Sequence, residues 1–187
     1  MNIVAIHGAW SSPTSFNHLR SQISANWRLV AYDHIKHDID DISVLADIAI
    51  TDPCIVIGHS LGGIAALTTH DNPLVKGIIT LASPTAGLEL NLIQQYLSRS
   101  KLISGIARGS RCINGIHAKT YDKPILHCIA GTGFNPFIYE DSDGVLPIKV
   151  QTSWTCGPMV KIDANHYEIL QHSDTVREID RFISTVL

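Results

Sequence analysis

The residues around Ser60 carry the sharpest chemical signal in the sequence. An apolar run, Cys54–Gly58, leads into His59, Ser60, Leu61 and Gly62, and a segment rich in alanine and leucine follows. Glycines two positions before and two after the serine leave room where a strand turns abruptly into a helix. The alternative is a glycine turn that happens to contain a serine, but such a turn predicts neither the strand nor the helix. The pattern therefore favours Ser60 as a nucleophile on a strained turn.

A serine nucleophile needs a base to take its proton and an oxyanion site to receive charge from the attacked carbonyl. The first apolar run ends in His7, Gly8, Ala9 and Trp10, where a glycine bend can turn the next backbone amide toward the serine. We expect the amides of Ala9 and Leu61 to donate to the oxyanion, and Leu61 also stands at a helix N-terminus that favours negative charge. An ordinary loop is the alternative interpretation of the His7–Trp10 segment.

Several motifs resemble those of a known superfamily. His7–Trp10 and Gly58–Gly63 resemble the corresponding motifs of α/β-hydrolases, and the likeness extends over nearly the whole chain. Thr80–Gly87 resembles the T-x-x-[ST]-P-x-x-G segment of bacterial lipases and GPI-inositol-deacylase-like proteins. Asp143–Pro147 is similar to their D-G-V-V-P motif, whose aspartate is the triad acid. The resemblance implies a carboxylic-ester hydrolase in which Asp143 orients the base.

The position of Asp143 agrees with the chain order of this fold. α/β-hydrolases present their triad in the order serine, acid, histidine, on loops at the C-terminal ends of strands. Asp143 follows the apolar run Ile125–Ala130 and precedes a glycine. Glu140 and Asp141 are competitors for the same role, and a surface loop with three carboxylates is the alternative.

The base must lie between the last strand and the last helix. His166 stands there, shortly after the apolar run Met159–Ile162. His172 remains a rival because it falls only a few residues later, at the approach to the helix. His59 is expected to be a packed, hydrogen-bonded residue, and His7 to brace the oxyanion loop. An ordinary imidazole titrates near pH ~6.5, so we expect activity to fall when His166 becomes protonated in mild acid.

Short apolar, β-branched runs alternate with segments of helical periodicity, which predicts right-handed crossovers between parallel strands. The pattern therefore predicts a mostly parallel sheet of about six strands covered by helices on both faces. Together with the resemblance to α/β-hydrolases, it implies a minimal α/β-hydrolase fold. The expected strands are Asn2–Ile6, Arg28–Tyr32, Cys54–Gly58, Val75–Leu81, Ile125–Ala130 and Met159–Ile162. The expected helices include Thr14–Ala25, which opens with a Ser12-Pro13 start signal, and Ile42–Ile50 and Ser173–Val186 behind Asp or Ser caps.

The length of 187 residues and the hydrophobic content of 45% fit one domain and are too little for two. Residues 85–120 are a candidate small cap or insertion. Apolar residues of this region could form an acyl-binding groove, although packing of helices onto the sheet explains them equally well. They are Leu88, Leu92, Ile93, Tyr96, Leu97, Leu102, Ile103 and Ile106.

Composition excludes several partners. A formal net charge of −3 without runs of Lys or Arg argues against a nucleic-acid or polybasic membrane partner. The ten histidines lack metal-type spacing, and we expect neither a metal nor a cofactor. The four cysteines lack C-x-x-C spacing, no signal peptide is visible, and no apolar stretch approaches the roughly 20 residues of a membrane span. A cytoplasmic location is the expectation.

These observations together predict a carboxylesterase or lipase that acts on a small-molecule acyl ester through an acyl-enzyme on Ser60. Two alternatives stay open: another acyl hydrolase with the same triad, such as a thioesterase or amidase, and a non-catalytic binding protein with the same fold. The sequence leaves the oligomeric state, the acyl chain length and the natural substrate undetermined.

Overall fold

The computed structural model describes residues 1–89 and 100–186 of the chain. Its centre is one six-stranded sheet in which every neighbouring pair of strands is parallel, in the order β2-β1-β3-β4-β5-β6. The strands are β1 (Asn2–Ile6), β2 (Asn26–Val30), β3 (Cys54–His59), β4 (Val75–Leu81), β5 (Ile125–Ala130) and β6 (Met159–Ile162). The predicted α/β fold with a mostly parallel sheet of about six strands is confirmed.

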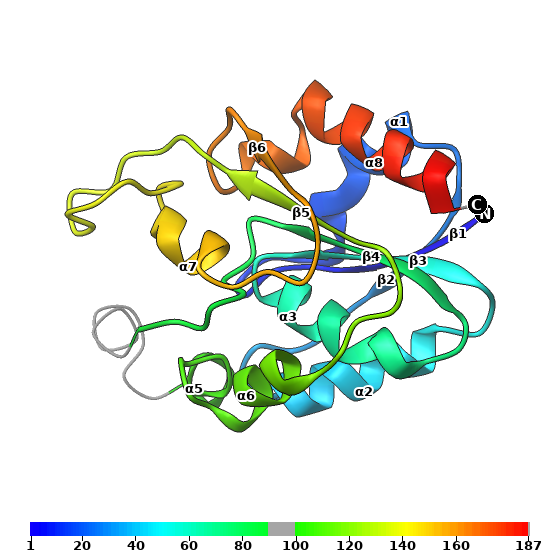
Figure 1. Ribbon diagram of the computed structural model, residues 1–187, viewed down its shortest axis with the longest axis horizontal. Helices are drawn as coiled ribbons and strands as arrows, with labels where there is room; N and C mark the ends of the chain where they lie inside the picture. The colour runs from blue at the N-terminus through cyan, green and yellow to red at the C-terminus, as the bar shows by residue number, and fades with distance from the viewer. Residues whose placement is uncertain (90–99, 187) are drawn as a thin grey trace.

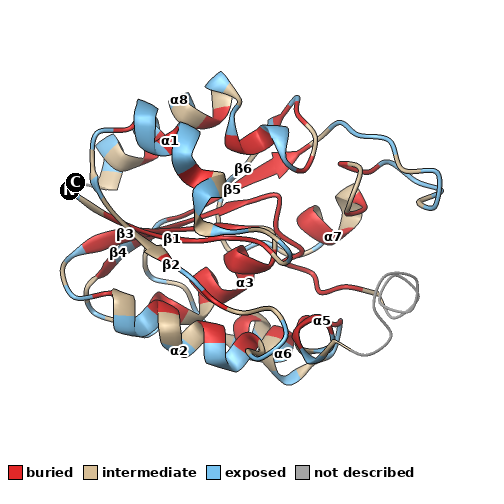
Figure 2. Cartoon of the chain, turned by 180° about the vertical axis from the view of Figure 1, so that it is seen from behind, coloured by how far each residue is buried: buried red, intermediate tan, exposed pale blue. Residues whose placement is uncertain are grey.

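Helices cover both faces of the sheet (Figures 1 and 2). One face carries the 3₁₀ helix η1 (Pro13–Phe16), α1 (Asn17–Gln22) and α8 (Ser173–Val186). The other carries α2 (Ile39–Ala49), α3 (Leu61–Thr68), α5 (Lys101–Gly105) and α6 (Arg111–Ala118). Two buried apolar clusters fill the spaces on the two sides. Because both faces are covered, β3 and β5 are buried along their whole length, which their continuous apolar sequences require.

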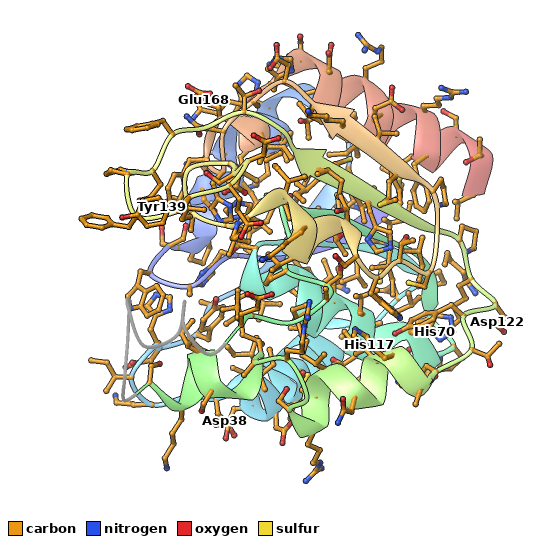
Figure 3. The ribbon with its side chains drawn as sticks, turned by 60° about the vertical axis from the view of Figure 1, so that its left-hand side comes forward. Asp38, His70, His117, Asp122, Tyr139 and Glu168 are labelled. Carbon is orange, nitrogen blue, oxygen red and sulfur yellow. The ribbon has the colours of Figure 1, made fainter. Side chains whose placement is uncertain are left out.

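The short helices complete the connections between the strands. The 3₁₀ helix η2 (Thr69–Asp71) joins α3 to β4, α7 (Ile148–Thr152) follows the long connection after β5, and η3 (Glu168–Leu170) lies between β6 and α8. The sheet's C-terminal edge, where the connections after β1, β3 and β5 begin, lies at the left of Figure 1. Figure 3 shows Tyr139, in the connection after β5, pointing outward at this side. His70 and Asp122, paired at 3.1 Å, lie at the other end.

The second strand and the first two helices differ from their predicted bounds. β2 is Asn26–Val30 and not Arg28–Tyr32, because its parallel register pairs Asn26 with Asn2 at the beginning of β1. The predicted helix Thr14–Ala25 divides into η1 and a shorter α1, which ends where Ile23 adopts an extended conformation. α2 begins at Ile39, three residues earlier than predicted, because Asp38 forms a capping box there.

The described residues of the candidate cap, 85–89 and 100–120, pack partly against one of the two buried apolar clusters. Leu88 forms a β-bridge with Ala107, and Ile113 and Ile116 of α6 are buried against the core. Of the apolar residues named for this region, Leu92, Ile93, Tyr96 and Leu97 lie outside the described residues. Whether the region acts as a lid stays a prediction.

The described part of the chain lacks two features. None of its helices is both long and apolar enough to cross a membrane. Residues 1–89 and 100–186 contain no cluster of three or more His, Cys, Asp or Glu side chains with the arrangement of a metal site. All four cysteines are free thiols, and Cys54 and Cys128 are buried.

Candidate active site

Ser60 occupies a strained turn between β3 and α3. Its φ of 54° and ψ of −123° are unfavourable for a residue with a side chain. The turn is held by a hydrogen bond of 2.8 Å from the Ser60 amide to the Leu81 carbonyl of β4. Glycines are needed beside it because a Cβ at position 58 would lie 2.5 Å from Gly63 Cα, and one at Gly62 would lie 2.6 Å from the His7 carbonyl oxygen. The hydroxyl is thereby lifted to the C-terminal edge of the sheet.

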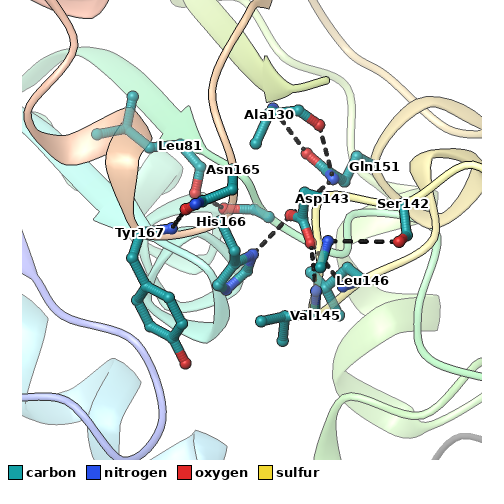
Figure 4. Close-up of polar contacts among 12 residues, drawn as sticks. Leu81, Ala130, Ser142, Asp143, Val145, Leu146, Gln151, Asn165, His166 and Tyr167 are labelled. Carbon is teal, nitrogen blue, oxygen red and sulfur yellow. Dashed lines mark hydrogen bonds and ion pairs between the residues drawn. The ribbon is translucent and has the colours of Figure 1, made fainter. Parts of the chain in front are cut away.

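Asp143 and His166 form a buried hydrogen-bonded pair at the same edge (Figure 4). The His166 Nδ1–H donates to Asp143 Oδ2 at 2.6 Å, and the His166 amide donates to the Asp143 carbonyl at 2.9 Å. Both residues are almost completely buried. Since Nδ1 faces a carboxylate and carries the proton in this arrangement, Nε2 of the neutral ring is left with a lone pair.

Both oxygens of Asp143 accept further hydrogen bonds. Oδ1 accepts from the amides of Val145 (2.9 Å) and Leu146 (2.6 Å), and Oδ2 also accepts from Gln151 Nε2 at 3.0 Å. No lysine or arginine among the described residues forms an ion pair with this carboxylate. Four hydrogen-bond donors thus compensate the burial of this carboxyl group, which lies where positive charge would develop on the His166 ring.

The segment after β1 lies directly against Ser60. A Cβ on Gly8 would be 3.0 Å from Ser60 Cβ, a tight contact, so a side chain at this position would press the turn and the nucleophile apart by a few tenths of an ångström. The His7 Nδ1–H donates to the Gly8 carbonyl at 2.9 Å, and the ring stacks on Tyr32 at 4.1 Å. The Tyr32 hydroxyl in turn donates to the His7 carbonyl at 2.8 Å. His7 thus braces the glycine bend from within, in agreement with the role expected for it.

A cavity of about 450 Å³ brings these parts together. Ser60, His166, Ala9 and Leu61 all line it, and so does the Gly144 that follows Asp143. Because Leu61 is the first residue of α3, its amide has no acceptor within the helix. Most of the remaining wall is aliphatic, including Leu88, Ile103 and Ile106 from the candidate cap and Pro84, Val145 and Leu146.

The competing site residues lie elsewhere. His172 does not line the cavity, and its Nδ1 accepts from the Asp174 amide at the beginning of α8. Glu140 pairs with Lys149 at 2.9 Å on the surface, and Asp141 is exposed. Among the residues with described positions, Asp143 is therefore the carboxylate that the structure brings to His166, and His166 is the histidine that it brings into the Ser60 cavity.

Burial changes the titration of two histidines beside the site. Desolvation lowers the pKa of His59 to about 3, helped by the neighbouring His166 ring. The His59 Nε2–H donates to the His166 carbonyl at 2.8 Å, so this neutral ring supports the backbone of the candidate base. Desolvation also lowers the pKa of His7. His59 is a packed, hydrogen-bonded residue, as the sequence indicated.

Two supporting residues escaped the sequence analysis. Gln151 contacts Asp143 from α7, and Tyr32 holds the His7 carbonyl from the segment after β2. Neither belongs to a recognised motif, because Tyr32 lies 25 residues from His7 and Gln151 lies eight residues from Asp143, beyond the D-G-V-V-P-like segment. The sequence placed Tyr32 at the end of a predicted strand, Arg28–Tyr32, which was the only sign that its position is fixed. The observed strand β2 ends at Val30, so that prediction was wrong.

Comparisons with known proteins place this geometry in a family. The model of the alpha/beta hydrolase family matches residues 3–127. The chain belongs to this family. The matched range contains the Ser60 turn and ends before Asp143 and His166, so the assignment of these two residues depends on the geometry of this alpha/beta hydrolase itself. A search of curated proteins finds no match.

Solved structures show the same fold at low sequence identity. The mature lipase BlEst2 of Bacillus licheniformis is similar with a TM-score of 0.73 and 14% identity, covering 99% of this chain and 91% of that one. A lipase-esterase related protein from Clostridium acetobutylicum has a TM-score of 0.60 and 12% identity, covering 100% and 94%. The Vlm2 thioesterase domain has a TM-score of 0.60 and 15% identity, covering 98% and 91%. The closer likeness to GPI-inositol-deacylase-like proteins stays a prediction.

Proposed function

We propose that this alpha/beta hydrolase is a serine carboxylic-ester hydrolase of the esterase or lipase type, with Ser60, His166 and Asp143 as its catalytic triad. The observation that carries the proposal is the 2.6 Å hydrogen bond from His166 Nδ1 to Asp143, in a pair whose histidine lines the cavity that contains Ser60. The strained conformation of Ser60 supports it, because backbone strain of this kind clusters at functional sites.

The first half of the reaction forms an acyl-enzyme. His166 Nε2 takes the proton of Ser60 Oγ while this oxygen attacks the ester carbonyl. Charge develops on the carbonyl oxygen, and we assign the amides of Ala9 and Leu61 as the donors that hold it. Collapse of the tetrahedral intermediate breaks the ester bond, and the departing alcohol receives the proton from His166.

Water reverses these roles in the second half. His166 deprotonates a water molecule that attacks the acyl-enzyme, and the serine oxygen leaves with the returned proton. Asp143 keeps the ring in the tautomer with a free Nε2 and stabilises its positive charge after each proton transfer. Every proton is thus moved by a side chain of this protein, and the proposed reaction requires no cofactor.

The shape and lining of the cavity indicate the substrate class. Its aliphatic wall, which includes Leu88, Ile103 and Ile106, fits the hydrocarbon part of an acyl ester. We therefore propose a small-molecule ester with an apolar acyl group as the substrate. The four free thiols agree with the reducing cytoplasm that the sequence suggests as the location.

Hydrolysis of p-nitrophenyl acetate, butyrate and octanoate tests the proposed function. We expect turnover by the wild type and its loss in Ser60→Ala and His166→Ala, whereas Ser24→Ala, which changes an exposed serine, retains it. The thioesterase alternative predicts faster turnover of the matching acyl thioester than of the p-nitrophenyl ester. A folded wild type that cleaves none of these substrates contradicts the proposal and favours the binding-protein alternative.

A further inference from the structure

Asp143 lies in a long connection outside the sheet, and most of its hydrogen bonds stay within that connection. Its amide donates to the Leu146 carbonyl at 3.0 Å, and Oδ1 accepts from the amides of Val145 and Leu146. These bonds orient the carboxylate relative to its own turn. They do not tie the turn to the sheet. The two hydrogen bonds from His166 join Asp143 to the segment after β6, and a link to β5 must come from another residue.

Gln151 provides such a contact. This side chain is 1% exposed and comes from α7. Its Oε1 accepts from the Ala130 amide at 3.1 Å, at the end of β5, and its Nε2 donates to Asp143 Oδ2 at 3.0 Å (Figure 4). The bond from the Ala130 amide fixes the orientation of the side-chain amide, because a flipped amide would place two donors against each other. Nε2 must therefore face the carboxylate.

We propose that Gln151 is a positioning residue for catalysis, whose side-chain amide links the carboxylate of Asp143 to the end of β5 and thereby holds His166 in register with Ser60. The proposal rests on the proposed function, since it assigns Gln151 a role in the same triad. Gln151 does not line the cavity, so it acts through Asp143 and not on the substrate.

The uncharged nature of this donor matters for the chemistry. Gln151 Nε2 and His166 Nδ1 donate to the same oxygen of Asp143. A lysine or arginine at this position would neutralise the carboxylate, which would then stabilise the protonated His166 ring less. An amide holds the oxygen in place and leaves the negative charge available for the imidazolium that forms when Ser60 loses its proton.

Other titratable groups near α7 do not replace this contact. Lys149 of the same helix lies at the surface, where it pairs with Glu140. His117 of α6 bonds to the backbone of the neighbouring 83–88 segment. Asp143 is therefore the ionisable group that shares a hydrogen bond with Gln151, and a new charge at position 151 would act on it directly.

Two substitutions separate positioning from packing. Gln151→Met keeps the approximate volume but removes the hydrogen bond to Asp143 and the two hydrogen bonds to the Ala130 backbone. Gln151→Glu keeps an acceptor for the Ala130 amide, and when protonated it also keeps a donor for Asp143. Burial beside a second carboxylate raises the pKa of such a glutamate, to roughly 8 or 9 in documented buried cases. Gln151→Glu should therefore resemble the wild type near neutral pH and lose the donor in alkali.

The test is the pH profile of kcat on p-nitrophenyl butyrate. We expect Gln151→Met to lower kcat by about 10- to 100-fold with little change in KM, the scale expected for a misplaced catalytic group. Gln151→Glu should retain much of the activity near neutral pH and gain a decline in alkali that the wild type lacks. Gln22→Met and Gln22→Glu, at an exposed position of α1, serve as matched controls and should follow the wild type.

Two additional measurements make each result decisive. Circular dichroism at every pH distinguishes a displaced carboxylate from an unfolded chain. Proton NMR of the His166 Nδ1–H observes the Asp143 contact without any turnover, so it tests Gln151 even if the proposed ester hydrolysis fails. We expect its downfield resonance to shift or broaden in Gln151→Met and to persist in Gln151→Glu at neutral pH. An unchanged resonance in folded Gln151→Met, or a Gln151→Glu profile that superimposes on the wild type, overturns the proposal.

Discussion

Replacing Asp143 by asparagine changes one atom of the carboxylate and should nearly abolish activity. In the wild type, four hydrogen-bond donors point at this side chain: two backbone amides at Oδ1, and His166 Nδ1 and Gln151 Nε2 at Oδ2. Asparagine offers one oxygen and one NH₂ group, so it can satisfy only one of the two sides.

Both placements of the new amide damage the site. If the NH₂ group faces His166, it requires Nδ1 to accept, and the proton moves to Nε2, where the ring can no longer act as a base toward Ser60. If it faces the amides of Val145 and Leu146, two buried donors lose their acceptor. The first placement takes away only the Asp143 acceptor of Gln151 Nε2, which keeps a 3.4 Å hydrogen bond to the Ala130 carbonyl. Its cost is about 1–3 kcal/mol at most, and it is the placement we expect.

The magnitude follows from this placement. Loss of the correct tautomer in a Ser-His-Asp triad lowers kcat by about 10⁴-fold, which corresponds to about 5.4 kcal/mol of transition-state stabilisation. The free energy of unfolding should fall by only about 1–3 kcal/mol. The assay is hydrolysis of p-nitrophenyl butyrate together with urea unfolding, with the exposed Asp141→Asn as control. A loss of kcat below 10-fold in folded Asp143→Asn refutes the role of this carboxylate.

Three further predictions follow from packing and burial. Gly62→Ala should lower the free energy of unfolding by about 1–3 kcal/mol or more, measured in urea, because its Cβ would strike backbone carbonyl oxygens of β1 and the His7 turn. Val145→Trp should narrow the cavity and lower octanoate hydrolysis at least 10-fold relative to acetate. Burial lowers the pKa of His59 to about 3 and of His127 to about 4. The unfolded chain therefore binds more protons than the folded chain below pH ~6.5. The free energy of unfolding should thus decrease as the pH is lowered, by roughly 1–2 kcal/mol per histidine between pH ~6.5 and ~5.

Matched variants control these three predictions. A Cβ at Gly115 of α6 meets nothing within 4 Å, so Gly115→Ala should stabilise the protein by about 0.5–1 kcal/mol. Val44→Trp changes an exposed residue of α2 and should leave the ratio of octanoate to acetate hydrolysis unchanged. His127→Gln should reduce the acid dependence of stability, whereas the exposed His18→Gln should not. Equal effects within any of these pairs contradict the corresponding prediction.

Local sequence patterns predicted the parts of the fold that depend on neighbouring residues. The apolar strands, the glycine-flanked turn at Ser60 and α8 all follow from periodicity, size and capping over a few positions. The bounds of β2 could not be predicted in this way, because they depend on the register of Asn26 against Asn2 on another strand. α1 is shorter than its apolar pattern because the chain must turn at Ile23 to enter β2.

The same distinction applies to the candidate site. Asp143 and His166 could be proposed from chain order and a glycine neighbour, and the structure brings them within hydrogen-bonding distance of each other. Gln151 could not be proposed, because its partners at Ala130 and Asp143 lie 21 and 8 residues away and share no motif with it. The aliphatic wall was predicted in part, since Leu88, Ile103 and Ile106 line the cavity.

The most direct test of the central claim is covalent labelling by a fluorophosphonate, followed by mass spectrometry of the labelled peptide. Such a probe reacts with a serine that a neighbouring base activates. The proposed function predicts one adduct, on Ser60, that disappears in Ser60→Ala and becomes much slower in His166→Ala. Absence of labelling in folded wild-type protein, or an adduct on another residue, would contradict the assignment of Ser60 as the nucleophile.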